Sequence, residues 1–523
     1  MFRKYILKIV LCIFCSGSAF LSEAQSFYDI TNYGAKKDGS EKATEAIKKA
    51  IDAATEAGGG TVFIPAGEYL TGPIYLKSNI TLHLDAGAYV RFSDTFDDYL
   101  PFVQSRYEGL MTKSFSPLIY AYEEENIAIT GRGTLDGQGK EWWYQAERLG
   151  GANKENYRFY DRYEKENKDT INAFSPYKSK KGFLRPPFIQ TLFCKNVRIE
   201  GITIVNSPFW TVTPEFCENV TITGITINNP PSPNTDGINP SSCRYVHISD
   251  CHISVGDDCI TIKSGKDESG RMMAVPAENY TITNCTMLSG HGAVVIGSEM
   301  SGGVKKITIS NCVFDGTDRG IRIKSTRGRG GVVEDIRVDN VIMKNIRKEA
   351  IRLNMFYSNV PEEPVSERTP IFRNIHFSDI TVEANIAVEL IGLPEMPIEN
   401  ITFSNINFTT KQGMTITDAR NIEIDHVEIN TEMGPSLQVI NTKDIEIFGL
   451  KTYTHHEGQP TIKFTNVEQA YLSGNRATLG TDVFLKVFGR ESKEIYLQNN
   501  FLKAAKKPIN KSSEVKGAVQ IDK

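Results

Sequence analysis

A short phrase of alternating polar and apolar residues recurs through most of this chain. It consists of a polar pair, often containing Asn, followed by aliphatic residues at every second position, as in Glu218-Asn219-Val220-Thr221-Ile222. An apolar side chain at every second position predicts a strand with one buried face. Copies of the phrase begin at Glu125, Lys195, Glu218, Arg244, Glu278, Lys306, Asp335, Asn374, Asn400, Asn421 and Asp444.

The spacing of these phrases predicts an all-β solenoid. They return with a period of roughly 20 to 30 residues, with Gly, Asn and Pro turns between them and no helical segment in most intervals. Each period is then one coil, and neighbouring coils are expected about 4.8 Å apart. A leucine-rich repeat is the nearest competitor, but Leu is sparse at the repeat positions. An antiparallel sandwich stays open as a second alternative.

Three segments depart from the repeat. A helix with Ser40 as its N-cap and a stop at Gly58–Gly60 is expected to cap the N-terminal end of the solenoid. Residues 136–181 are polar and aromatic, which predicts an insertion over one side of the coil. Residues 505–523 are rich in Lys, and we expect them to form a mobile tail.

The cysteines are predicted to be unpaired. Seven of the nine lie between Cys194 and Cys312, and an odd number excludes full pairing. They recur at equivalent positions of the phrase, so we expect two internal ladders of small buried side chains. These ladders are Cys194, Cys217 and Cys243, and Cys251, Cys285 and Cys312.

The first 24 residues predict a cleaved signal peptide. Basic residues begin the chain, an apolar run extends from Ile6 to Phe20, and Ser22-Glu23-Ala24 has the small-x-small pattern of a cleavage site. The run is shorter than the roughly 20 residues that span a bilayer, so we expect no membrane span. The mature chain, residues 25–523, is predicted to be a single exported domain, either periplasmic or extracellular.

The formal net charge of −4 argues against nucleic acid as a partner. An anionic ligand would therefore need a local basic patch. No metal site with paired CxxC spacing is present in the sequence, and we expect no cofactor. We expect the protein to be a monomer.

Three aspartates fall within about one period of the repeat. Asp236 and Asp257 occur just after turns at similar phases, and Asp258 follows directly. Carboxylates crowded on one surface resist simultaneous ionisation, so at least one pKa rises. One group then donates a proton while its neighbours act as bases, as glycoside hydrolysis requires. The alternatives are turn-forming aspartates and a calcium site.

Two further motifs follow these aspartates. His291 lies between two glycines one repeat later, where we expect it to tune the protonation of a carboxyl group. Five cations and no acid occur from Arg319 to Arg329, and the alternation places Arg322 and Lys324 on one face of a strand. Beside a carboxylate cluster, such cations are suited to clamp the carboxylate of a sugar acid. A solvated cationic face is the simpler alternative.

The four motifs Asn234-Thr235-Asp236-Gly237, Gly256-Asp257-Asp258, Gly290-His291-Gly292 and Arg322-Ile323-Lys324 resemble, in this order, those of the polygalacturonases, glycoside hydrolase family 28. The resemblance extends from about Tyr28 to the last repeats. It implies a right-handed, single-stranded parallel β-helix of the pectin-lyase-like kind, and hydrolysis of galacturonic-acid linkages in pectin with inversion.

The resemblance also implies roles for individual residues. Asp257 would be the general acid, Asp236 and Asp258 would activate water, and His291 would support the acid. The predicted substrate-binding residues are Asn234, Arg322, Lys324 and Tyr357, the last by spacing alone. For an inverting enzyme we expect acid and base about 6.5–9.5 Å apart.

The expected substrate is a pectic polysaccharide or oligogalacturonide. The insertion and the stretch Gly290–Gly303 resemble the longer, exo-acting bacterial members, so we expect action at chain ends. Homogalacturonan and rhamnogalacturonan both remain open as substrates. The competing functions are a calcium-dependent pectate lyase and a noncatalytic β-helix that binds polysaccharide.

Overall fold

A computed structural model of the chain describes residues 27–148, 157–174 and 185–521. The predicted signal peptide, residues 1–24, lies outside the described residues. Across the described ranges, no helix is long and apolar enough to cross a membrane.

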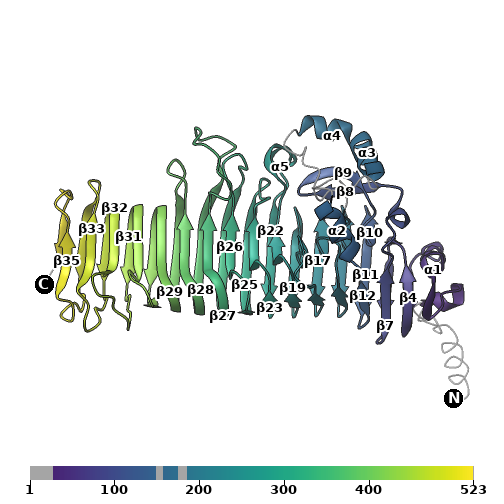
Figure 1. Cartoon of the computed structure of the whole chain (residues 1–523), viewed down its shortest axis with the longest axis horizontal. Coiled ribbons are helices and arrows are strands. Elements are labelled where there is room, and N and C mark those ends of the chain that lie inside the picture. Colours follow the sequence, from purple (N-terminus) through teal and green to yellow (C-terminus); the bar gives the residue numbers. More distant parts are fainter. Residues whose placement is uncertain (1–26, 149–156, 175–184, 522–523) are drawn as a thin grey trace, which may run out of the picture.

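The repeated phrases form parallel strands that stack coil upon coil into one long β-helix (Figure 1). Equivalent residues pair in register: Val197 lies opposite Val220, which lies opposite Val246 in the next coil. The prediction of a parallel β-helix is confirmed, and the parallel pairing rules out an antiparallel sandwich.

Each coil of the N-terminal half contributes strands to three columns. The first column consists of β1 (Phe27–Asp29), β3 (Gly60–Ile64), β6 (Ile80–Leu84), β11 (Glu125–Gly131), β14 (Lys195–Glu200), β17 (Glu218–Thr223), β19 (Arg244–Ser249) and β22 (Ala277–Thr283). The second consists of β2 (Asp38–Lys42), β4 (Gly67–Thr71), β7 (Ala88–Phe92), β12 (Thr134–Asp136), β15 (Thr203–Val205), β18 (Thr226–Asn228), β20 (His252–Ser254) and β23 (Thr286–Ser289). The third consists of β5 (Ile74–Tyr75), β10 (Ile119–Tyr122), β13 (Ile189–Leu192), β16 (Val212–Glu215), β21 (Asp258–Ile262), β24 (Gly292–Gly297) and β26 (Ile321–Lys324).

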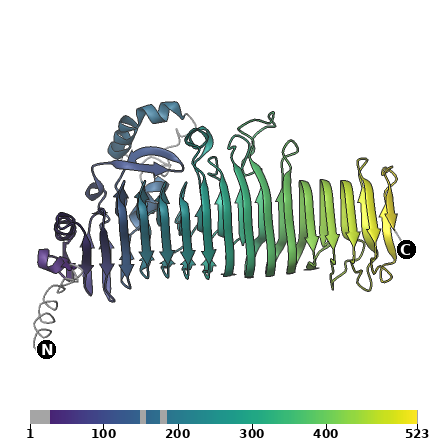
Figure 2. The same cartoon turned by 180° about the vertical axis from the view of Figure 1, so that it is seen from behind.

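The later coils are more regular, and single long strands run through more than one column. The view from behind shows these coils following one another to the C-terminus (Figure 2). The strands of these coils are β25 (Val304–Asp315), β27 (Val332–Asn354), β28 (Ile371–Ile391), β29 (Ile398–Asp425), β30 (Glu428–Thr431), β31 (Leu437–Phe448), β32 (Pro460–Ser473), β33 (Val483–Phe488) and β34 (Lys493–Gln498).

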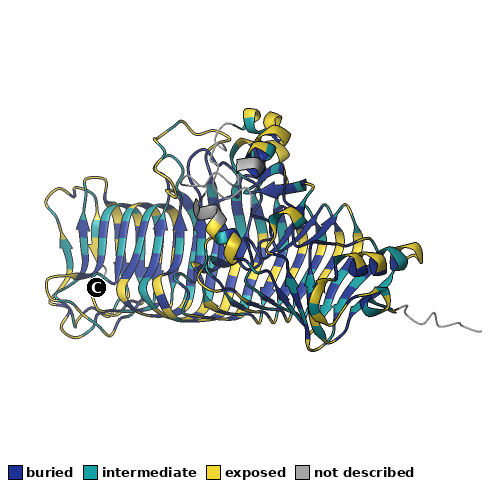
Figure 3. Ribbon diagram, turned by 45° about the vertical axis from the view of Figure 1, so that its right-hand side comes forward, coloured by how far each residue is buried: buried dark blue, intermediate teal, exposed yellow. Residues whose placement is uncertain are grey.

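The interior of the solenoid is filled by the alternating aliphatic residues, so buried and exposed positions alternate along the strands (Figure 3). Val220 and Ile222, from the phrase that begins at Glu218, are fully buried. Each such side chain contributes roughly 1.5–3 kcal/mol by leaving water. All seven described cysteines are free and buried, which confirms the prediction of unpaired thiols.

The N-terminal helix α1 (Thr44–Glu56) forms as expected, with Ile47, Ala50 and Ile51 buried. Its N-cap prediction is wrong. Ser40 lies in strand β2, and its hydroxyl donates to Asp38 at 2.6 Å instead. The N-cap position is occupied by Ala43, three residues later, because Asp38–Lys42 is drawn into parallel pairing with β4.

The described part of the insertion forms helices α2 (Lys140–Arg148), α3 (Tyr157–Glu166) and α4 (Lys168–Ala173) beside the coil (Figure 1). A hairpin that the sequence did not predict, β8 (Val103–Tyr107) with β9 (Leu110–Ser114), lies with them. Trp142 is fully buried and packs on Phe96 with ring centroids 4.1 Å apart. The insertion is therefore anchored by its aromatic residues.

The structure corrects the prediction of a mobile tail. Residues 505–521 contain β35 (Lys507–Lys511) and β36 (Val519–Ile521), which pair in parallel with β33 and β34. Apolar residues among the lysines, such as the buried Val515, are sufficient to complete a last coil.

Candidate active site

The four motifs meet on the outer face of the third column. Ile238 bridges to Ile260, so Asp236 lies beside Asp258 in the next coil. The sequence spacing had suggested Asp257 for that place. Asp257 instead lies beside His291, whose backbone N–H donates to the Asp257 carbonyl at 2.8 Å. The three aspartates still converge, because Asp257 and Asp258 are neighbours in the chain and Asp236 lies in the adjacent coil.

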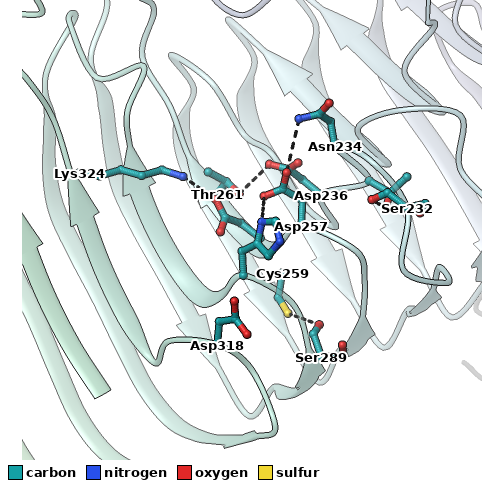
Figure 4. A network of polar contacts seen from close by, with 12 residues as sticks. Ser232, Asn234, Asp236, Asp257, Cys259, Thr261, Ser289, Asp318 and Lys324 are labelled. Atoms are coloured by element: carbon teal, nitrogen blue, oxygen red, sulfur yellow. Dashed lines mark hydrogen bonds and ion pairs between the residues drawn. The ribbon is translucent and has the colours of Figure 1, made fainter. Parts of the chain in front are cut away.

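The carboxyl groups of Asp236, Asp257 and Asp258 form one cluster, and Figure 4 shows the first two side by side. One oxygen from each lies within 4.8 Å of the others. They line a polar pocket of about 250 Å³. The side chain of Asp257 is 19% exposed, against 4% for Asp236 and 2% for Asp258. Asp257 is therefore the carboxyl that a ligand in the pocket reaches most readily.

Each carboxylate has its own polar partner. Thr261 donates to Asp236 at 3.2 Å (Figure 4). The Lys324 ammonium lies 2.8 Å from Asp258. Asp257 lies 3.1 Å from Nδ1 of His291 and accepts a long bond, 3.5 Å, from Asn234. The second oxygen of Asp258, Oδ1, is buried and has no hydrogen-bond partner among the described residues.

These surroundings separate the pKa values of the cluster. Burial and the charge of Asp257 raise the pKa of Asp236 to about 8, against the opposing charge of Lys263. Burial also acts to raise the pKa of Asp257, but its hydrogen bond with His291 and the charge of that ring outweigh burial, so this pKa is lowered. The same hydrogen bond raises the pKa of His291. Without substrate, a proton in the cluster favours Asp236.

The spacing of the carboxylates is shorter than the expectation for inversion. Their nearest oxygens lie within 4.8 Å, whereas inverting pairs are typically about 6.5–9.5 Å apart. This separation joins the nearest oxygen of each carboxylate, so other oxygen pairs lie farther apart. It gives no support to the wide spacing that the resemblance implied.

The cations of the third column divide into two groups. Arg319, Lys324, Arg327 and Arg329 form ion pairs with Glu349, Asp258, Glu395 and Asp267. Arg322, by contrast, has no acidic partner among the described residues, and its buried Nε has no hydrogen bond.

Tyr357 joins the two cations on which the prediction rests. The Arg322 guanidinium lies 5.6 Å from the centre of its ring, and the Lys324 ammonium lies 5.5 Å from it. The tyrosine side chain is 44% exposed and lines the pocket. The structure thus brings together the cations and the tyrosine that the sequence selected.

Several residues of the site were missed by sequence reasoning. Lys263 and Glu299 line the pocket and are almost fully buried, and Trp210 lies under the Lys263 ammonium at 4.0 Å. Arg185 donates to Asn234 at 2.8 Å and so orients it toward Asp257. Lys263 could have been found, because it directly follows β21 and alternates with the core residues Ile260 and Ile262, which directs it to the outer face of the coil.

The aspartate oxygens are close enough to share a cation, as the calcium alternative requires. Two ammonium groups already neutralise them, Lys324 at 2.8 Å from Asp258 and Lys263 at 3.8 Å from Asp236. A divalent ion would be repelled by both. The donor set therefore fits a metal poorly.

Fold and site together define a glycoside hydrolase built on a parallel β-helix. The model of glycosyl hydrolases family 28 matches residues 170–431, and a model described as rhamnogalacturonase A/epimerase, pectate lyase-like, matches residues 27–112. The chain belongs to family 28 of the glycosyl hydrolases.

The relatives of this chain include several polygalacturonases. A probable polygalacturonase of Vitis vinifera is 32% identical, covering 75% of this chain and 77% of that protein. An endo-polygalacturonase of Pectobacterium carotovorum is 29% identical, covering 76% and 92%. The crystal structure of an exopolygalacturonase from Thermotoga maritima is 33% identical, with a TM-score of 0.68, covering 77% of this chain and 91% of that one. Both endo and exo enzymes are similar to this chain.

Proposed function

We propose that this protein hydrolyses α-linked galacturonic acid in pectin. The observation that carries the proposal is the convergence of three carboxylates with Lys324 and Tyr357 in one pocket. Beside Tyr357 lies Arg322, which has no acidic partner among the described residues. Acid and base groups cleave a glycosidic bond, and the arginine supplies a partner for the carboxylate of the sugar. The relatives named polygalacturonase support the same substrate class.

The test is incubation with defined oligogalacturonides. We expect new reducing ends and saturated products, unaffected by a chelator. An unsaturated product that absorbs in the ultraviolet, formed only with calcium, would contradict the proposal and indicate a lyase.

Asp257 is proposed as the general acid. It is the most exposed carboxyl of the three, so a glycosidic oxygen in the pocket reaches it first. The proton passes from Asp257 to that oxygen as the bond to the sugar breaks. Either Asp236 or Asp258, in its ionised form, takes one proton from the attacking water, whose oxygen bonds to the anomeric carbon of the sugar. With one group protonated and one ionised, the cluster performs both transfers.

The proposed acid must gain its proton when substrate binds, because the substrate-free cluster favours Asp236. Two effects of binding act in that direction. A galacturonate carboxylate beside Lys324 partly neutralises the positive charge that, without substrate, stabilises the ionised aspartates. The sugar also displaces water from Asp257. Both raise the pKa of Asp257.

Inversion is proposed from the family resemblance. Proton NMR of the first product formed decides it, since the α-linked substrate would yield the β anomer. An initial α product would indicate retention, which the close approach of the carboxylates would then explain.

We propose that the enzyme acts at chain ends, because the hairpin β8–β9 blocks one end of the pocket. Its turn residue Glu108 lines the pocket and pairs with Lys266 at 2.7 Å. A side chain at Gly109 would meet the Lys266 backbone at 2.7 Å, so the hairpin turn touches the segment before α5 (Asp267–Met273). On the opposite side, the outer face continues in register from Arg322 to Arg352.

The geometry also gives a direction. The hairpin packs on Gln190 and Glu215, in coils before the aspartates, and its turn reaches Lys266, so the polymer would extend from the pocket toward the C-terminal coils. Product analysis tests exo action: monomers or dimers should appear from the first minutes. A ladder of intermediate oligomers would contradict it.

Export to the periplasm or beyond is proposed from the sequence of residues 1–24, and a pectic polymer outside the cell is consistent with it. Fractionation of the producing cells, with N-terminal sequencing of the mature protein, tests this. Retention of the segment in a cytoplasmic protein would contradict it.

A further inference from the structure

Two buried charged groups of the pocket have no part in the proposed reaction. Lys263 directly follows strand β21, and Glu299 follows strand β24. Their side chains are 8% and 10% exposed, and the ammonium lies 3.6 Å from a carboxylate oxygen of Glu299. Buried ions are costly unless they are paired, so this pair requires a physical reason.

The Lys263 ammonium is divided between two carboxylates. It lies 3.8 Å from Asp236 and 3.6 Å from Glu299, and no hydrogen bond to either is formed in the described structure. Trp210 covers it, with the ammonium 4.0 Å from the ring centre. The ammonium can therefore move toward either carboxylate. The closer it lies to Glu299, the less its positive charge stabilises the ionised form of Asp236.

Register explains why the division is stable. Lys263, Gly297 and Lys324 occupy equivalent positions in three successive coils. Position 297 carries no side chain between the two lysines, and the Lys324 carbonyl packs so closely that a Cβ there would meet it at 2.3 Å. Lys324 is committed to Asp258 at 2.8 Å, whereas Lys263 has no such short contact. Glu299 is fixed through its carbonyl, which accepts from the Ser264 N–H at 2.7 Å.

We propose that Glu299 and Lys263 are positioning residues that set how firmly the aspartate cluster holds its catalytic proton. The proposal rests on the proposed hydrolysis. Neither residue exchanges a proton with the substrate. Glu299 limits the positive charge that Lys263 presents to Asp236, so the cluster keeps one proton at a pH where three exposed carboxylates would have lost theirs.

Other charges surround this couple from every neighbouring segment, and they stay in place in the variants below. They are Glu108, Arg185, Asp257, Asp258, Lys266, Lys324 and Arg329.

The test is the pH profile of kcat/KM for two variants of opposite sign. Glu299→Gln leaves Lys263 free to favour ionised Asp236, so the cluster loses its proton more easily and the profile moves to lower pH. Lys263→Met removes the cation, so the profile moves to higher pH. We expect about one pH unit in each direction. The double variant should return toward the wild-type profile, because both charges are gone.

A purely structural pair predicts a different result, in which both single variants lose stability and activity with the profile unmoved. That outcome, or shifts of the same sign, would overturn the proposal. Glu395→Gln is the matched control: it also breaks a carboxylate–cation pair, with Arg327, but it lies outside the residues that line the pocket. A wild-type protein without hydrolytic activity would refute the proposed function instead.

Discussion

Asp257 combines the greatest exposure of the three aspartates with a lowered pKa. The first property suits a general acid, and the second opposes it unless substrate changes the surroundings. Asp236 has the opposite combination, since it is almost fully buried and its pKa is raised to about 8. At the scale of single residues, the question is therefore which of these two aspartates is the general acid.

The general acid can be identified by comparing variants on substrates whose leaving groups differ in their need for a proton. Asp257→Asn should lower kcat on pectic oligosaccharides by about 10²–10⁴-fold, because the leaving oxygen is no longer protonated. On an aryl galacturonide with a nitrophenol leaving group, which departs without a proton, the loss should be much smaller. Asp236→Asn should lose activity on both substrates. The reverse pattern would assign the acid to Asp236.

Arg322 is the residue on which recognition of the sugar acid is expected to depend. Arg322→Ala should raise KM for oligogalacturonides by about 10- to 100-fold, because a charged hydrogen bond is lost. The folded structure should be unchanged, since no ion pair of the described residues is broken. Steady-state kinetics measure it, with Arg337→Ala as the control. An unchanged KM would show that the substrate carboxylate binds elsewhere.

At the scale of elements, the hairpin β8–β9 is held from both sides. Underneath, Arg106 is buried and pairs with Glu215 at 3.3 Å. Above, the side chain of Asn167, at the start of α4, accepts from the Lys113 N–H at 2.6 Å and donates to its carbonyl at 2.8 Å. The described part of the insertion thus fixes the hairpin that we propose closes one end of the pocket.

Asn167→Ala should therefore loosen the hairpin. It leaves the partly buried backbone N–H and C=O of Lys113 without their side-chain partner, at about 1 kcal/mol. We expect longer oligomers among the early products of polymer hydrolysis, with kcat on a dimer almost unchanged. Chromatography of the products measures this. Asn385→Ala, which removes a side-chain bond to the Arg347 carbonyl far from the hairpin, is the control. The same product pattern in both variants would contradict the role of the hairpin.

At the scale of the whole molecule, each coil is stabilised mainly by its neighbours. A solenoid of this kind needs its ends covered, by α1 at one end and by the coil of β35 and β36 at the other. Lys507, Pro508 and Lys511 on β35 are residues that discourage pairing with a further chain.

Deletion of residues 505–523 tests the role of that last coil. Removing it exposes the edges of β33 and β34, so the midpoint of thermal unfolding should fall, by about 1 °C for each 1 kcal/mol lost in a chain of this length. Activity should stay within about twofold, because contacts between coils are local. An unchanged midpoint would mean that the tail adds nothing to the fold, as its lysine-rich sequence suggested.

The sequence alone determined the repeat, the solenoid, the unpaired cysteines and the motifs of the site. All of these follow from local periodicity or short motifs, which the chain displays directly. Ser40 shows the limit, because pairing with a distant strand overrode its capping tendency.

Only the tertiary structure decided which coil lies beside which and at what offset. That register paired Asp236 with Asp258, placed Asp257 beside His291, and brought Lys263 and Glu299 from separate turns into one buried pair. Pairing with β33 and β34 also makes the lysine-rich residues 505–521 a final coil. Turns of variable length separate the strands, so contacts between coils cannot be counted from spacing along the chain.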